Sequence, residues 1–189
     1  MALVAEGSYV QSDFPLRFRD NTHLRSVIGA DMSIGRRIRT SFRVGYAEKT
    51  FDQTIGKNSF GEPVWNGMFE WDLRRNTTVQ METGRKIYEL AMINQPNDVS
   101  KFNIHNWISA RWAEQWTDRL STNSSYTYRE TSYEGGDGSE DAHQLLVSAR
   151  YYLRHDLAFV FDIAYTKIED DLGKDVSRQT ITFRIDFNL

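Results

Sequence analysis

The chain has 189 residues, a formal net charge of -3 at pH 7 and no cysteine. Its length allows one domain with a sizeable core, and the lack of cysteine excludes disulfide scaffolds, thiolate zinc sites and thiol catalysis. The small net charge argues against a nucleic-acid binder, and no apolar run approaches the roughly 20 residues of a membrane-spanning helix.

Polar and apolar residues alternate along the chain in segments of about 9 to 13 residues, and this period of two is typical of β-strands. In chain order the segments are 2–12, 23–34, 38–49, 64–73, 77–88, 101–114, 121–132, 143–153, 157–168 and 176–189. Helical periodicity is scarce. The sequence therefore predicts an all-β protein with ten visible strands.

The connections between these segments alternate in length. Short ones follow the even segments, at 35–37, 74–76, 116–119 and 154–156. Long polar ones follow the odd segments, at 12–22, 50–63, 89–100, 132–142 and 169–175. Pro15, Pro63 and Pro96 lie in or beside the long connections, where a missing N–H does no harm. An antiparallel up-and-down meander would therefore carry its tight turns at one end and its loops at the other.

Each strong segment has one large apolar face and one face of small or charged residues. In 157–168, for example, Phe159 and Phe161 oppose Val160 and Asp162. A soluble sandwich or lipocalin-like barrel alternates too. The turn asymmetry, the even number of segments, their span length and the mixed charges of the polar face favour a transmembrane β-barrel. Such a sheet must close in lipid, either by pairing 2–12 with 176–189 or through further strands.

Two stretches carry a resemblance to a known family. WNGMFEWDLRRNTTVQMETGRKI (65–87) has its pattern of strand, tight turn, TTV and strand, and LLVSARYYLRHDLAFVFDIAYTKIEDDLGKDVSRQTITFRIDFNL (145–189) is similar to its carboxy-terminal end. The chain thus resembles outer-membrane porins of the beta-barrel porin 2 type, which bacterial exopolysaccharide and capsule export systems encode. Family members are usually longer. The resemblance implies that residues 1–189 are a single barrel domain, or the end of a larger barrel, in the outer membrane of a Gram-negative bacterium.

The polar face supplies the candidate functional residues, which either line a pore or pair and plug it. They are Arg39, Arg43, Glu70, Asp72, Arg111, Arg129, Arg150, Asp162, Arg184 and Asp186. If a pore is open, a slight excess of basic residues would attract anionic sugar polymers. Inward Trp107 and Tyr152 are candidates for stacking against sugars. The expected function is therefore a passive, porin-like part of polysaccharide export, and the alternative is a closed barrel that acts as an anchor or adhesin through its loops.

The last strand carries a second candidate signal. Phe183, Ile185, Phe187 and Leu189 alternate to the end of the chain and resemble the signal read by the barrel-assembly machinery. That machinery, outer-membrane lipid, lipopolysaccharide, polysaccharide and export-system proteins are the expected partners, with no nucleic acid. We expect no enzyme, cofactor or metal, because the four histidines are far apart and no hydrolase or phosphate-loop motif occurs.

Overall fold

The computed structural model describes residues 1–12, 21–53, 56–89, 102–133, 138–154, 156–171 and 175–187. Its strands are β1 (Ala2–Ser12), β2 (Asn21–Ile34), β3 (Ile38–Gln53), β4 (Gly56–Arg74), β5 (Thr77–Glu89), β6 (Phe102–Gln115), β7 (Leu120–Tyr133), β8 (Ser139–Arg154), β9 (Leu157–Asp170) and β10 (Asp175–Phe187). Within these residues no helix is long and apolar enough to cross a bilayer.

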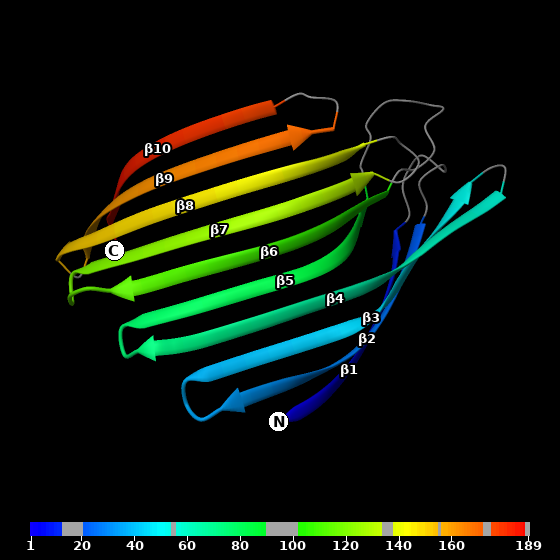
Figure 1. Cartoon of the computed structure of the whole chain (residues 1–189), viewed down its shortest axis with the longest axis horizontal. Helices are drawn as coiled ribbons and strands as arrows, with labels where there is room; N and C mark the ends of the chain where they lie inside the picture. The colour runs from blue at the N-terminus through cyan, green and yellow to red at the C-terminus, as the bar shows by residue number, and fades with distance from the viewer. Residues whose placement is uncertain are drawn as a thin grey trace.

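All ten strands form one sheet in which each strand is antiparallel to its neighbours in chain order. Figure 1 shows the sheet as a meander with its tight turns at one end. Gly35 opens the turn between β2 and β3 with a φ of 62°, a left-handed conformation that glycine adopts without steric cost. The turn closes the Ile34–Ile38 pair and so fixes the register of β3 against β2.

Two expectations about the connection between β3 and β4 are wrong. The predicted loop 50–63 is mostly strand, because pairing continues as far as Gln53 and Gly56. Pro63 consequently lies inside β4, opposite Tyr46. Proline is tolerated there because the pairing of β4 with β5 begins only at Trp65, so no β5 residue is in register with Pro63. The other two prolines lie outside the described residues.

The predicted connection 132–142 is also shorter than expected, since β7 ends at Tyr133 and β8 begins at Ser139. The strand ends on both sides of this connection have many polar residues, and such a composition is typical of loops. Cross-strand pairs such as Thr131 with Glu140 continue the ladder through this polar stretch. Backbone pairing therefore extends beyond the part of each strand in which polar and apolar residues alternate.

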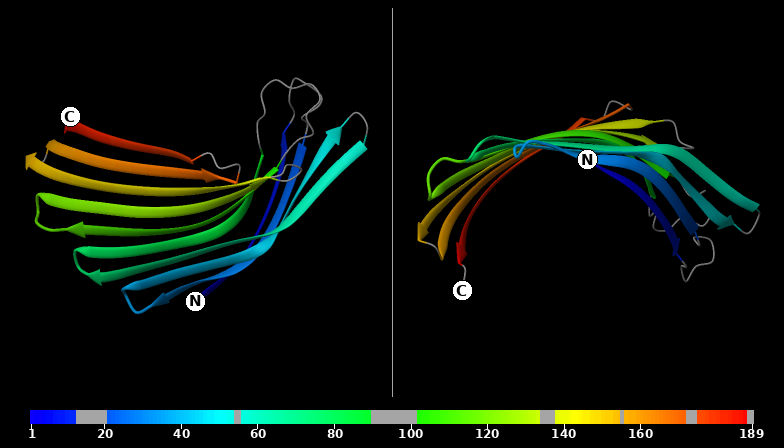
Figure 2. Two further views of the ribbon diagram at one scale, coloured as in Figure 1. Left: turned by 45° about the horizontal axis from the view of Figure 1, so that its top comes forward. Right: turned by 90° about the horizontal axis from the view of Figure 1, so that it is seen from below.

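The sheet is strongly arched (Figure 2), so its two faces differ in crowding. On the convex face side chains spread apart: Phe161 is 42% exposed, and the large apolar residues of neighbouring strands are exposed with it. On the concave face they converge, and adjacent Val160 is 1% exposed. The convex face is thus a continuous apolar surface, whereas the concave face carries the small and charged residues.

The most tightly packed part of the sheet lies over β2–β5. Val27, Ala47, Val64 and Ile87 form a buried cluster against which Phe60 packs. Gly45 lies between Val27 and Val64 in register, and a Cβ atom built on it would lie 1.9 Å from the carbonyl oxygen of Ser26. Glycine at this position lets the backbones approach where the sheet bends.

The sheet has two edges. β1 pairs only with β2 and β10 only with β9 among the described residues, and Figure 2 shows β1 and β10 apart at opposite sides of the arch. Pairing between the first and last segments is therefore not present in this part of the chain. The ten strands form an arc of barrel wall.

Candidate functional site

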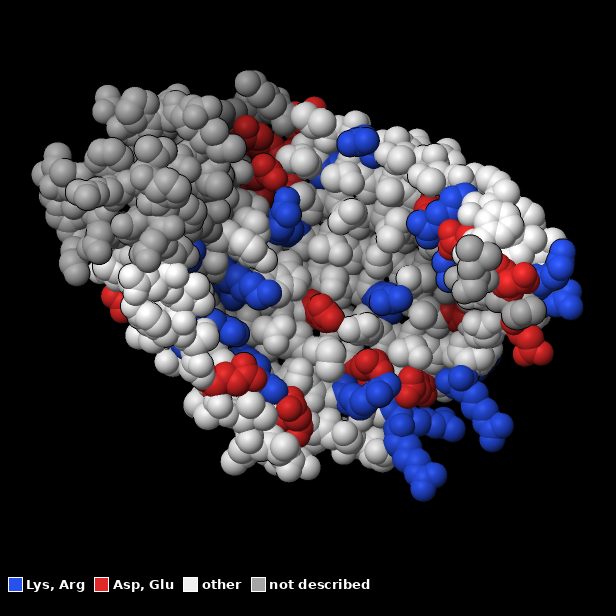
Figure 3. All heavy atoms as spheres, turned by 180° about the vertical axis from the view of Figure 1, so that it is seen from behind, with Lys and Arg blue, Asp and Glu red and all other residues white. Residues whose placement is uncertain are grey.

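The charged side chains of the concave face form the candidate site. Figure 3 shows this face, with the molecule turned so that it is seen from behind relative to Figure 1, and Lys and Arg are interspersed there among Asp and Glu. The register places the ten predicted residues in inward positions on seven strands: Arg39 and Arg43 on β3, Glu70 and Asp72 on β4, Arg111 on β6, Arg129 on β7, Arg150 on β8, Asp162 on β9, and Arg184 and Asp186 on β10. Whether they line a pore stays a prediction.

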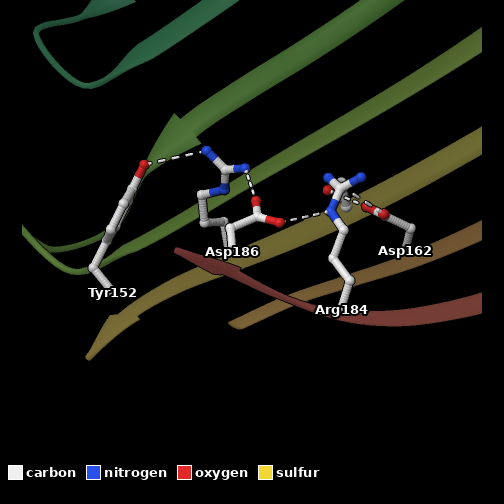
Figure 4. Close-up of polar contacts among 6 residues, drawn as sticks. Tyr152, Asp162, Arg184 and Asp186 are labelled. Carbon is white, nitrogen blue, oxygen red and sulfur yellow. Dashed lines mark hydrogen bonds and ion pairs between the residues drawn. The ribbon is translucent and has the colours of Figure 1, made fainter. Parts of the chain in front are cut away.

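One network joins β8, β9 and β10 near the tight turns (Figure 4). Arg150 donates to Asp186 at 2.5 Å and to the hydroxyl of Tyr152 at 3.4 Å. Arg184 lies 3.2 Å from the other oxygen of Asp186 and 3.9 Å from Asp162. Asp186 thus bridges two arginines, and the network holds their guanidinium groups against the wall.

A polar hollow adjoins this network. It has a volume of about 220 Å³ and is lined by Ser121, Asn123, Ser148, Arg150 and Arg184, with buried Val160 at its base. Ser148 donates to Asp162 at 2.5 Å, so one wall of the hollow is fixed by the same carboxylates. Hydroxyl, amide and guanidinium groups here suit water or a polar solute.

A second network lies on β1–β4. Arg39 contacts Glu70 and lies 3.6 Å from Asp72. Arg43 pairs with Asp31 at 2.8 Å, lies 3.7 Å from Glu6, and is one of the more enclosed cations, with its side chain 15% exposed. Cross-strand pairs of this kind stabilise a sheet modestly when solvent reaches them. Their main consequence is positional, because each cation is directed along the wall.

The cations of β5–β7 have fewer acidic partners. Arg129 lies 3.6 Å from Glu140, while Arg111 donates to the amide oxygen of Asn123 at 2.8 Å. Lys86 lies over the ring of Trp107, with Nζ 5.1 Å from the ring centroid. Sequence reasoning selected Trp107 through its inward position but overlooked this contact. The only sequence signal for this contact was the spacing of Gly84 and Lys86. Gly84 lies opposite Trp107, and Lys86, two residues further along β5, points to the same face.

Several sequence-predicted features lie elsewhere or outside the described residues. Phe183, Ile185 and Phe187 lie on the convex face of β10, 63%, 47% and 69% exposed, and Leu189 is outside the described range. Within the long polar connections 132–142 and 169–175, residues 134–137 and 172–174 are likewise not described. At their borders Asp171 accepts hydrogen bonds from the backbone and hydroxyl of Ser139.

The loop end of the convex face carries a polar cluster that the pattern did not reveal. Tyr126 shares a hydrogen bond with His143 at 2.8 Å, Tyr128 donates to Asp141 at 3.1 Å, and Lys167 contacts Glu169. Tyrosines with polar partners are common where a barrel wall leaves hydrocarbon for water. The cluster therefore marks the upper border of the apolar surface.

Comparison with known proteins gives a family and a fold. The sequence model described as "Putative beta-barrel porin 2" matches residues 8–187. The in-vitro folded trimer form of OmpT, an outer membrane protein of Vibrio cholerae, is similar with a TM-score of 0.57 and 10% identity, over 98% of this chain and 81% of OmpT. A second OmpT structure gives 0.56 and 9%, over 98% and 80%. No curated protein sequence matches. The similarity confirms the predicted antiparallel up-and-down outer-membrane barrel fold.

Proposed function

The chain belongs to the "Putative beta-barrel porin 2" family, and from this premise we propose that it is a porin-like channel component of exopolysaccharide secretion. The protein is located in the bacterial outer membrane. We propose a Gram-negative host and passive transport, in which the charges of the inner face select what passes. The observation that carries the proposal is the division of the sheet into an apolar convex face and a concave face lined with both signs of charge.

The physical argument begins with the backbone. In hydrocarbon an unpaired N–H or C=O costs several kcal/mol, so spanning strands need partners on both sides. The free edges of β1 and β10 must therefore pair, whether with one another or with additional strands. Small barrels are filled by side chains, whereas those of about 16 to 18 strands leave a water-filled channel. Strand number thus decides whether the charged face lines a channel.

The alternative function is an anchor or adhesin that conducts nothing. The ion pairs favour it: Arg39, Arg43, Arg150 and Arg184 all contact carboxylates on the concave face. In a narrow barrel such paired side chains would fill the interior. A channel and an anchor would have the same barrel wall. They differ in whether a continuous column of water crosses the barrel interior.

Single-channel recording in planar bilayers separates them. We expect the purified full chain to give discrete current steps, and the Arg150→Gln, Arg184→Gln double variant to reduce anion selectivity, measured as a shift of the reversal potential in a KCl gradient. The matched control is Lys167→Gln on the convex face. Folded protein that gives no current above the empty bilayer would overturn the channel proposal and support the anchor.

We further propose that the chain is not an enzyme. His105 packs on Tyr88 with ring centroids 4.2 Å apart, an arrangement suited to packing. Lipid and peptide substrates should show no turnover with the folded protein. Turnover that is lost in a His105→Ala variant would refute this proposal.

We propose that the barrel-assembly machinery recognises β10, and that lipid and lipopolysaccharide contact the convex face. The supporting observation is the exposed row Phe183, Ile185 and Phe187. Replacing Phe187 by Ser should slow insertion in a reconstituted assembly reaction, while Asp186→Asn on the opposite face should not. Equal insertion rates for wild type and Phe187→Ser would contradict recognition of this row.

A further inference from the structure

An aromatic and basic cluster lies on the concave face of β5–β7, outside the ion-paired networks. It consists of Trp107, Lys86 and Arg129 and is called here the Trp107 cluster. Trp107 is in register with Gly84 on one side and with Arg129 on the other. Lys86 is two residues beyond Gly84 and therefore points to the same face. Three adjacent strands thus bring one indole ring and two cations together on the same face.

Gly84 makes room for the indole ring. A Cβ atom at this position would lie 2.4 Å from Cζ2 and 2.5 Å from Cη2 of Trp107. The ring therefore lies over the backbone of β5, in space that any other residue would fill. A tryptophan seated against a strand in this way is held in orientation and keeps part of its surface toward the interior, since Trp107 is only partly buried.

The two cations of the cluster are available to an anion. Lys86 is exposed and has the Trp107 ring as its contact, 5.1 Å from the centroid, and it makes no ion pair among the described residues. Arg129 is 43% exposed and has one carboxylate, Glu140, at 3.6 Å. Lysine has a flexible stem and a compact charge, so Lys86 can turn from the ring toward an incoming carboxylate.

We propose that the Trp107 cluster binds a carboxylated sugar residue of the transported polysaccharide. The apolar C–H face of a sugar ring packs on the indole, while Lys86 and Arg129 bind the carboxylate through charge-assisted hydrogen bonds. The inference rests on the proposed function, because it identifies the polymer as one that contains uronic acid. It specifies the substrate class that exopolysaccharide passage alone leaves open.

The same combination at β8 does not form such a site. Tyr152 also lies beside a cation, with Arg150 5.8 Å from its ring centroid. Arg150 already binds Asp186 at 2.5 Å, and Arg184 binds the same carboxylate. A sugar carboxylate would have to displace Asp186 there, whereas at the Trp107 cluster it meets two cations, of which only Arg129 has a carboxylate partner among the described residues.

Equilibrium binding tests the proposal. Purified full-length protein folded in detergent micelles is titrated calorimetrically with trigalacturonate and with neutral maltotriose. We expect trigalacturonate to bind at least about tenfold more tightly than maltotriose, the ratio that one charge-assisted hydrogen bond provides. Lys86→Gln should remove this preference, and Trp107→Ala should weaken trigalacturonate binding about tenfold or more, since it deletes the stacking surface.

Matched controls use the other face of the same wall. Trp112 lies on the convex face of β6, 42% exposed, and Lys167 pairs with Glu169 on β9; Trp112→Ala and Lys167→Gln should bind as wild type. Lys86→Arg keeps the charge and should retain the preference, which guards against a folding defect in Lys86→Gln. Folding of each variant is checked by heat-modifiable migration in electrophoresis.

The binding proposal and the channel proposal can each be overturned without the other. Equal affinity for the two sugars, or equal losses in Trp107→Ala and Trp112→Ala, would overturn the Trp107 cluster as a subsite even if the protein conducts ions. Selective binding that depends on Lys86, in a protein that gives no current, would leave the subsite in place and overturn the channel.

Discussion

The two ends of the concave face are built differently. Over the loop-side half of β2–β4, beyond the ion pairs of Arg39 and Arg43, it is closed by apolar contacts, with Val27, Ala47 and Val64 buried around Gly45. Over β8–β10 it is polar, and Arg150, Arg184 and Asp186 share contacts beside a hollow of about 220 Å³. One curved sheet thus provides an apolar packed region and an ion-paired region with a polar hollow on the same side.

The difference shows how curvature and side-chain size act together. Where the sheet bends sharply, inward side chains meet one another, and small apolar residues fill the space without water. Where it is more open, the inward positions leave room for water beside charges of both signs. The convex faces of the two ends do not differ in this way, as Phe42 and Phe183 are 52% and 63% exposed.

The largest effects are expected on the shared convex face. Arginine in place of Phe42 or Phe183 should lower the free energy of unfolding by about 2–4 kcal/mol near the bilayer centre and by less toward its surface, because a charge then faces hydrocarbon. Arginine at the inward neighbours Ser41 and Thr182 should change it by under about 1 kcal/mol. Urea unfolding in lipid vesicles measures all four. Equal losses of unfolding free energy on the two faces would contradict the assignment of the convex face to lipid.

The next effect separates the two ends. Gly45→Ala places a methyl group 1.9 Å from a backbone oxygen, so β2 and β3 must move apart, at a cost of about 1–3 kcal/mol. Gly7→Ala on β1 is the matched control, since its Cβ would meet no atom within 4 Å. The same unfolding assay applies. A Gly45→Ala protein as stable as Gly7→Ala would show that the bend is not closely packed.

A smaller effect is expected from the ion-paired end. The Asp162→Asn, Asp186→Asn double variant removes the acidic partners of Arg150 and Arg184. Partly exposed pairs contribute about 0–1 kcal/mol each, so stability should fall by about 1 kcal/mol while the reversal potential moves toward that of chloride. Asp118→Asn, in the tight turn outside the network, is the control. Unchanged selectivity would mean that this network does not face the permeating ions.

The smallest effect is the response to salt. Raising KCl from about 0.1 M to 1 M shortens the screening length from about 10 Å to 3 Å. Amide hydrogen exchange should therefore quicken slightly in β8–β10 and stay constant around Val27 and Val64, whose contacts are apolar. An equal change in the rate of amide hydrogen exchange at both ends would indicate that the ion pairs do not stabilise β8–β10 locally.

Much of the fold could be predicted from alternation, and the reasons for the errors are physical. Phe183 and Arg184 fall on opposite faces because strand side chains have a period of two. The extension of β3 and β4 was missed because Gly56, Asn58 and Pro63 read as loop residues, although cross-strand pairing maintains them as strand. Tertiary pairing there overrides local preference.

The candidate site was predictable only in outline. Inward positions follow from sequence, but partners depend on register: Arg39 reaches Glu70 because β3 and β4 align those residues directly. The partner of Lys86 depends on Gly84, which allows the indole of Trp107 to cross β5. No pattern of alternation contains that information.

The strictly sequential order of the strands has a mechanical consequence. Every strand pairs with its neighbours in the chain and with no distant one among the described residues, so the sheet behaves as a one-dimensional array of hairpins. A force applied at one terminus would then peel strands away in sequence order, with each released hairpin leaving the rest of the ladder intact. Assembly in the opposite direction needs only short chain loops to close at each step, which keeps its entropic barriers low.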